Sequence, residues 1–230
     1  MSESHPILLS ALTGFFFGLL LSMPIGPVNL TIINGAAQRG FKYAALIGLG
    51  AATMDVIYCT IAFTGFSSFF GIRLVKTSME VFTFVFMLFL GIKFLTAKTV
   101  VAPTQLGDTA SRIEKRIDEK FHPHSAFMTG FVRVMGNLGV LLFWIVLAAN
   151  LLSRDWVDDT PAGKSACIAC VALGAITWFC ALSYYVARRG YGRFSEKTLL
   201  RMERFSGICL LGIGLFDGAN IAWKLAQHRM

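Results

Sequence analysis

The sequence predicts an all-α, polytopic membrane protein with six transmembrane helices in two inverted repeats of three helices each. Only 15% of the 230 residues are charged, whereas a soluble domain carries about 25%. Residues 4–38 and 165–187 contain no Asp, Glu, Lys or Arg, and apolar stretches of this length are typical of membrane-spanning helices. The two halves of the chain also resemble each other, which predicts the repeats.

Six apolar segments are expected to span the membrane: residues 7–33, 43–66, 77–97, 125–152, 165–187 and 205–223. The first is expected to be retained, because no Lys or Arg precedes it and no small-residue cleavage site follows it. Glu80 and Lys93 mark the two ends of the third. The chain is therefore predicted to be a single membrane domain over residues 1–230. Its first repeat covers residues 7–97, a polar loop residues 98–124, and its second repeat residues 125–226.

The distribution of basic residues predicts the orientation. Of the 21 Lys and Arg residues, 14 fall in the loops on one side of the predicted spans and six on the other, while Arg133 lies inside a span. Because Lys and Arg are enriched in cytoplasmic loops, the side with 14 is expected to be cytoplasmic. Both termini are then outside a bacterial inner membrane, and so is the acidic loop at residues 154–164.

Composition also argues against several other classes of protein. The net charge of +8 does not indicate nucleic-acid binding, because the basic residues lie between apolar runs and form no basic face. All five cysteines lie within apolar segments, where they are expected to act as small apolar residues and not as disulfides or metal ligands. No cofactor is expected.

The two halves resemble each other in their second spans and in their first spans. Residues 50–53 read Gly-Ala-Ala-Thr and residues 174–177 read Gly-Ala-Ile-Thr. Each half also opens with an interrupted, glycine-rich span. Because each half has an odd number of spans, a duplication places the halves in opposite orientations, as in many secondary transporters.

The first interruption is the run Met23-Pro24-Ile25-Gly26-Pro27-Val28-Asn29. Pro24 and Pro27 each remove a backbone donor and clash with the preceding turn, so a continuous helix cannot pass through. In a membrane such a break is tolerated where protein or a water-filled cavity satisfies the freed backbone groups. The break also exposes a helix N-terminus at residues 28–31, which suits a carboxylate. A simple kink is the alternative.

The second interruption, at residues 136–139, favours a binding site over a kink, because paired breaks at corresponding positions are typical of transporter sites. Three amides near the breaks are expected to contribute hydrogen-bonding groups for a substrate: Asn29, Asn34 and Asn137.

Three ionisable residues lie inside predicted spans: Asp55, Arg133 and Asp217. Each costs about 2.5–3.5 kcal/mol at a helix centre, so such residues usually face the protein interior and pair with one another. Two acids and one base cannot all be neutralised together, which favours proton binding by Asp55 during transport, with Arg133 at the substrate site. Tyr58 shares the helix face of Asp55 and is expected to join its network. The alternative is a static Asp55–Arg133 pair that only fixes the packing of two spans.

The pattern Gly14-Phe-Phe-Phe-Gly18 followed by Met23-Pro-Ile-Gly-Pro27 resembles the Pro-Gly-Pro hallmark of the lysine exporter (LysE/RhtB) translocator family. The resemblance continues through glycines of the second span to its aspartate: Gly35, Gly40, Gly48, Gly50 and Asp55. It implies six spans in two inverted halves and export of amino acids driven by the proton gradient. The site residues that it implies are Pro24, Gly26, Pro27, Asn29, Gly50 and Asp55.

The chain departs from this family in two places. Its first motif contains an inserted Ile, and its fourth span has Asn137-Leu138-Gly139 where the family has Asn-Pro-Lys. Export of lysine itself is therefore not expected.

The function predicted from the sequence is secondary, proton-coupled export of amino acids or related small zwitterionic solutes. The expected partners are this solute, protons and the lipid bilayer, and a homo-oligomer is compatible with the sequence. One alternative is a divalent-cation transporter of related architecture, with Asp55, Asp217 and the pair Cys167 and Cys170 as ligands. The other is a membrane-embedded enzyme, for which no nucleophile with an adjacent base is evident.

Overall fold

The chain contains two broken helices, and both breaks lie where the sequence predicts them. The computed structural model describes residues 4–24, 26–65, 73–96, 125–189 and 196–227. These residues form eight α-helices and no strand. The helices are α1 (Ser4–Ser22), α2 (Pro27–Arg39), α3 (Phe41–Gly65), α5 (Arg73–Leu95), α7 (Ala126–Met135), α8 (Leu138–Ser153), α9 (Pro161–Arg189) and α10 (Glu196–Gln227).

Each predicted span coincides with one helix or one bent pair of helices. The first coincides with α1 and α2, which meet at 74°, and the fourth with α7 and α8, which meet at 68°. Within the described residues, α3 and α9 are long and apolar enough to cross a membrane, and the count rises to four when each bent pair is taken as one span. The structure is therefore all-α with several membrane spans, while the six-span inverted repeat stays a prediction.

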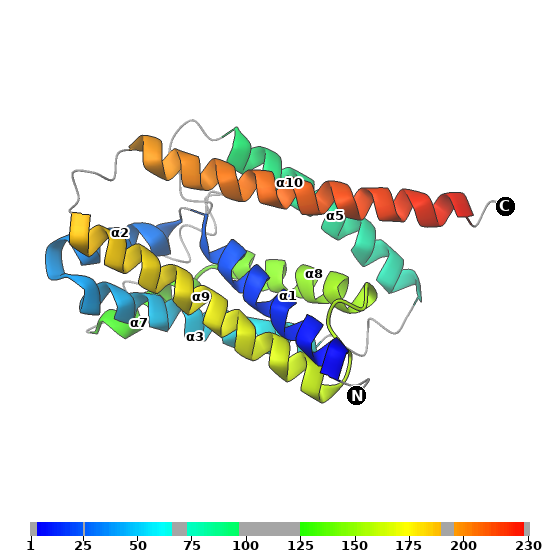
Figure 1. Ribbon diagram of the computed structural model, residues 1–230, viewed down its shortest axis with the longest axis horizontal. Helices are drawn as coiled ribbons and strands as arrows, with labels where there is room; N and C mark the ends of the chain where they lie inside the picture. Colours follow the sequence, from blue (N-terminus) through cyan, green and yellow to red (C-terminus); the bar gives the residue numbers. More distant parts are fainter. Residues whose placement is uncertain (1–3, 25, 66–72, 97–124, 190–195, 228–230) are drawn as a thin grey trace.

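The helices pack across the boundary between the two halves. The most extensive contacts join α1 to α9, α3 to α7, and α5 to α10. Figure 1 shows α5 and α10 side by side at the top, and α9 running beside α1 below them. The first helix of each half (α1 or α7) thus packs against the helix of the second predicted span in the other half (α9 or α3).

Glycines allow the close approach in both of these cross-half pairs. A Cβ on Gly18 of α1 would meet the backbone of Val171 in α9, and one on Gly130 of α7 would meet the backbone of Ile47 in α3. In the opposite direction, Gly174 of α9 faces the backbone of α1, and Gly50 of α3 faces the backbone of α7. Small residues at helix interfaces are the usual basis of tight helix association in membranes.

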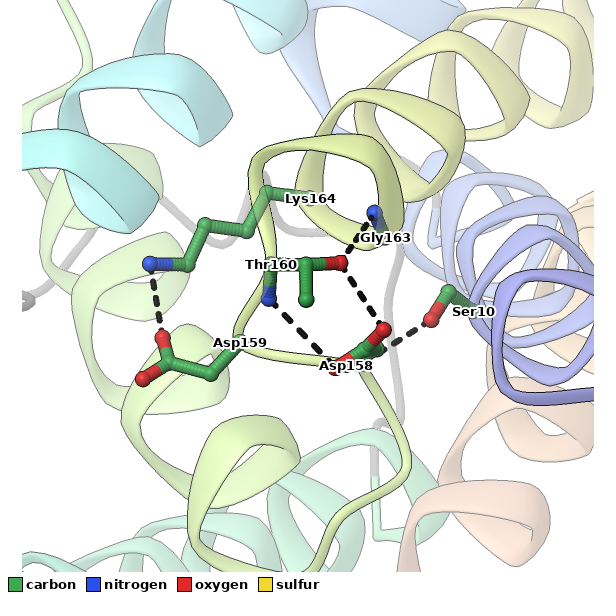
Figure 2. A network of polar contacts seen from close by, with 6 residues as sticks. All are labelled: Ser10, Asp158, Asp159, Thr160, Gly163 and Lys164. Atoms are coloured by element: carbon green, nitrogen blue, oxygen red, sulfur yellow. Dashed lines mark hydrogen bonds and ion pairs between the residues drawn. The ribbon is translucent and has the colours of Figure 1, made fainter. Parts of the chain in front are cut away.

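The segment between α8 and α9 is held in place by its own polar side chains (Figure 2). Thr160 precedes Pro161 and caps α9: its Oγ1 accepts a hydrogen bond from the Gly163 N–H at 3.1 Å and donates one to Asp158 at 2.8 Å. The backbone N–H of Asp158 donates to Ser10 Oγ of α1 at 2.9 Å, and Lys164 pairs with Asp159 at 2.7 Å. The predicted acidic loop is thus an ordered connection fixed to α1.

Candidate functional site

Both helix breaks border one cavity, with a volume of about 190 Å³. Its remaining walls come from α3, α5, α9 and α10. The break residues and polar side chains that line it are Ser22, Pro24, Gly26, Pro27, Asn29, Asp55, Asn137 and Gly139. We refer to this space as the central cavity. The two interruptions and Asp55, predicted from separate stretches of sequence, therefore border a common space.

The first break presents an uncapped helix N-terminus to the central cavity. Gly26 is the N-cap of α2, has extended backbone angles (φ −110°, ψ −175°) and makes no side-chain cap, and Pro27 follows as the first helical residue. Helix geometry leaves the N–H groups of Val28 and Asn29 without acceptors inside the helix, and the helix dipole places partial positive charge there. Gly26, Pro27, Val28 and Asn29 all line the cavity.

Asn29 satisfies the backbone that the first break leaves open. Its Nδ2 donates to the carbonyl oxygens of Ser22 at 2.8 Å and of Pro24 at 2.6 Å. The residue is only 3% exposed, and its Oδ1 has no hydrogen-bond partner among the described residues. Because a buried amide oxygen without a partner is costly, this acceptor is suited to a donor supplied by a ligand.

The second break is closed by its own residues. Asn137 Oδ1 accepts a hydrogen bond from the Gly139 N–H at 3.1 Å, so the side chain caps α8. At the end of α7, the Met135 carbonyl accepts a hydrogen bond from the Tyr58 hydroxyl of α3 at 2.8 Å. Tyr58 therefore stabilises the break from the helix that carries Asp55, and it is not itself among the residues lining the cavity.

Asp55 is the one charged residue among the lining residues that the structure describes. The indole N–H of Trp144, from α8, faces the Asp55 carboxylate and is placed to donate to it. Trp144 is 2% exposed and also lines the cavity. A carboxylate held by a donor from another helix has a fixed position at the site, which a lone acid on α3 would lack.

Besides Tyr58, two residues predicted for the site, Arg133 and Asn34, are not among the described residues that line the cavity. For Arg133 the reason lies in helix geometry, since Val134 lines the cavity and the preceding residue lies about 100° away around the helix. The pairing of Arg133 with Asp55 stays a prediction. Asn34 is exposed on α2. The side chain of Asp217, on α10, lies outside those that the structure describes.

Sequence reasoning missed the role of Trp144 and of the aromatic wall. Phe86 of α5 and Phe143 of α8 line the cavity with their ring centroids 5.8 Å apart. All three are apolar or aromatic residues within apolar spans, where most such residues contact lipid or core. The one signal in the sequence that could have distinguished Trp144 from the other aromatic residues is its position two helical turns after the second break.

Within the described residues, no group of three or more His, Cys, Asp and Glu side chains is placed to hold a metal ion. Cys167 is fully buried in the interface between α1 and α9, where the Gly14 backbone packs on it. The described residues thus provide no set of convergent ligands of the kind that cation transport requires.

The chain is similar to known proteins over most of its length. Over 202 residues the chain is 28% identical to a protein of Bacillus subtilis (strain 168) that is provisionally named amino acid efflux protein YcgF. The match covers 87% of this chain and 91% of that protein. No solved structure gives a significant match. The family described as LysE type translocator matches residues 19–217, which include both helix breaks and Asp55, and the chain therefore belongs to this family.

Proposed function

We propose that this protein is a secondary active exporter that moves amino acids or related small zwitterionic solutes out of the cell in exchange for protons. One observation carries the proposal: an uncapped helix N-terminus, an amide oxygen with no partner in the described part of the chain and a carboxylate border the same small cavity. The family and the efflux protein of Bacillus subtilis support amino-acid export. Because family members are transporters, an enzymatic role is not proposed.

The central cavity offers a separate partner to each charge of a zwitterion. A substrate carboxylate would accept hydrogen bonds from the free N–H groups at the start of α2, where the helix dipole favours an anion. A substrate ammonium group would donate to the Asp55 carboxylate and to Asn29 Oδ1, which has no other partner among the described residues. Because the cavity is lined by protein on most sides, these interactions are stronger there than they would be in solution.

Asp55 is the residue that we propose carries the proton. No Lys or Arg is among the described residues that line the cavity, and the donor that faces the carboxylate is the indole of Trp144. Release of the substrate ammonium would leave a poorly solvated negative charge, and proton uptake would remove it. Competition between proton and ammonium for one carboxylate gives exchange of the two.

The reciprocal packing of the halves supports two inverted repeats that rock around this site. Gly18 and Gly174 bring α1 and α9 together, just as Gly130 and Gly50 bring α7 and α3 together. Broken helices at the interface of such repeats are typical of transporters that work by alternating access. The proposed location is the bacterial inner membrane, with both termini outside.

Proteoliposomes containing the full chain test this function. They are loaded with a mixture of labelled amino acids, and efflux is followed with and without an acidic external buffer. We expect the acidic buffer to accelerate efflux and to acidify the lumen, since protons enter as solute leaves. Efflux of no amino acid would contradict export, and efflux indifferent to the pH gradient would contradict proton coupling.

Asp55→Asn tests the role of the carboxylate in the same assay. The amide keeps the size of the side chain but neither binds a proton nor carries charge, so we expect pH-driven efflux to be abolished. Asp159→Asn is the matched control, because Asp159 lies in the loop and its side chain is 82% exposed. Undiminished efflux by Asp55→Asn would contradict the proposed proton site.

A further inference from the structure

We infer that the central cavity selects amino acids with an uncharged aliphatic side chain of about the size of valine, leucine or methionine. The inference rests on the proposed function and adds the class of substrate to it. It comes from the part of the cavity that the two helix breaks and Asp55 do not occupy.

That part of the cavity is apolar. Its walls are side chains of four helices other than α2 and α3: Phe86, Leu90 and Phe94 of α5, Phe143 of α8, Phe179 of α9 and Leu210 of α10. The polar groups, by contrast, belong to the two breaks, to α3 and to the indole of Trp144. Ser22 does not add polarity, because its hydroxyl donates to the Gly18 carbonyl at 2.8 Å.

The aromatic and aliphatic wall is packed in advance of any ligand. Leu90, Phe94 and Leu210 belong to one buried cluster, against which Phe86 and Phe143 pack. A preformed apolar surface favours an apolar group because binding removes both surfaces from water without reordering the protein.

The charge of the lining argues against basic and acidic side chains. Among the described lining residues Asp55 alone is charged, and in the proposed function it pairs with the substrate's α-ammonium group. A lysine or arginine side chain would bring a second cation with no counter-charge, and an acidic side chain would bring an anion with no cation. Either charge would lose its hydration without compensation.

The volume of the cavity limits the size of the side chain. A cavity of about 150 Å³ lined by Leu, Ile and Phe holds benzene, which has six carbon atoms. On the same scale, the 190 Å³ measured here accommodates about eight non-hydrogen atoms. Valine has eight and leucine and methionine nine, whereas phenylalanine has twelve.

Counterflow into proteoliposomes of the full chain tests the inference. Vesicles hold excess unlabelled leucine, and entry of labelled leucine is measured against external valine, methionine, alanine, phenylalanine, serine, lysine or glutamate. We expect methionine to compete as leucine does and valine to compete within about fourfold of leucine, whereas lysine, glutamate and serine should compete at least tenfold less well. Alanine should lose about fourfold in affinity for each carbon that it lacks relative to leucine.

A variant of the wall makes the test specific to the cavity. Phe86→Ala removes a ring from the lining, so phenylalanine should gain about tenfold relative to leucine. Phe89→Ala is the matched control on the same helix, since Phe89 is 50% exposed and does not line the cavity. Its selectivity should be that of the unmodified protein.

The outcomes separate the inference from the proposed function. Transport of lysine, glutamate or serine as well as leucine would overturn the aliphatic selectivity and leave amino-acid export standing. Unchanged selectivity in Phe86→Ala would show that this wall does not contact the side chain, and would also overturn the inference. Transport of no amino acid by the unmodified protein would overturn both. The competition series needs no variant, so poor folding of Phe86→Ala leaves the test intact.

Discussion

Asn29 illustrates how a single side chain makes a broken helix tolerable inside a membrane. Without it, the carbonyl groups of Ser22 and Pro24 would lose the donors that Asn29 Nδ2 now supplies, and each unsatisfied group in a membrane costs several kcal/mol. The donors of Asn29 are used by these carbonyls, whereas its acceptor Oδ1 has no hydrogen-bond partner among the described residues. The structural and ligand-binding roles of the residue therefore use different atoms.

Trp144 is the residue whose contribution is most readily separated from packing. Trp144→Phe keeps an aromatic ring in the buried site but removes the donor to Asp55. Because hydrogen bonds to charged groups contribute about 1.5–3 kcal/mol, we expect pH-driven efflux to fall by about tenfold or more. The measurement is the initial efflux rate in proteoliposomes, at equal amounts of inserted protein.

Trp178→Phe is the matched control for this change. The indole nitrogen of Trp178 is buried but has no hydrogen-bond partner among the described residues, and Trp178 does not line the cavity. Its replacement should leave efflux unchanged. Equal losses in the two variants would mean that Trp144 acts through packing and not through Asp55.

The sequence was sufficient to find the residues whose chemistry is unusual for a membrane span. Pro24, Pro27 and Asp55 stand out because each is costly in an apolar helix, and all three line the cavity. Arg133 is equally costly but lies on a different face of α7. Burial cost identifies a residue with a role, while the face that it occupies depends on how the helices pack.

At the level of elements, the two breaks differ in the capping of the helix that follows each of them, although both breaks contain glycine. At the second break Asn137 caps α8 with its own side chain, whereas at the first break Gly26 provides no cap for α2. The N-terminus of α2 is therefore the better anion site of the two. Sequence patterns predicted the positions of both breaks, but capping depends on side-chain geometry that local sequence does not determine.

The helix interfaces predict the effect of adding one methyl group to a glycine. In Gly50→Ala the new Cβ would overlap the Phe127 carbonyl of α7, so α3 and α7 must separate. Overpacking of this kind costs about 1–3 kcal/mol, which corresponds to a fall in melting temperature on the order of 5 °C for a chain of this length. Thermal unfolding of the purified protein in detergent measures it.

Gly212→Ala is the matched control, because a Cβ on Gly212 of α10 meets no atom within 4 Å. Alanine is the better helix former, so this variant should be as stable as the unmodified protein or slightly more so. A similar loss of stability in both variants would indicate that the α3–α7 contact is looser than described.

At the scale of the whole molecule, order along the chain was easier to predict than spatial arrangement. Apolar length alone located α3 and α9, and the prolines and glycines located the two bent pairs. That α1 packs on α9 and α7 on α3 could not be derived from spacing, because a glycine stripe shows that a helix approaches another closely but not which one. The cavity is a product of this pairing.

The predicted orientation of the chain in the membrane has a direct test that uses the ordered connection between α8 and α9. In a background without the five native cysteines, Asp159→Cys places a thiol in the connection between α8 and α9, at a position where the native side chain is 82% exposed. If the 14 basic residues of one side face the cytoplasm, this thiol is outside and should react with a membrane-impermeant maleimide in intact cells. Lys115→Cys, in the polar segment 98–124 outside the described residues, should react only after the membrane is permeabilised. The reverse labelling pattern would mean that the chain is inserted in the opposite orientation, so that transport past the uncapped end of α2 and Asp55 would run in the opposite direction. The protein would then have to be tested as an importer.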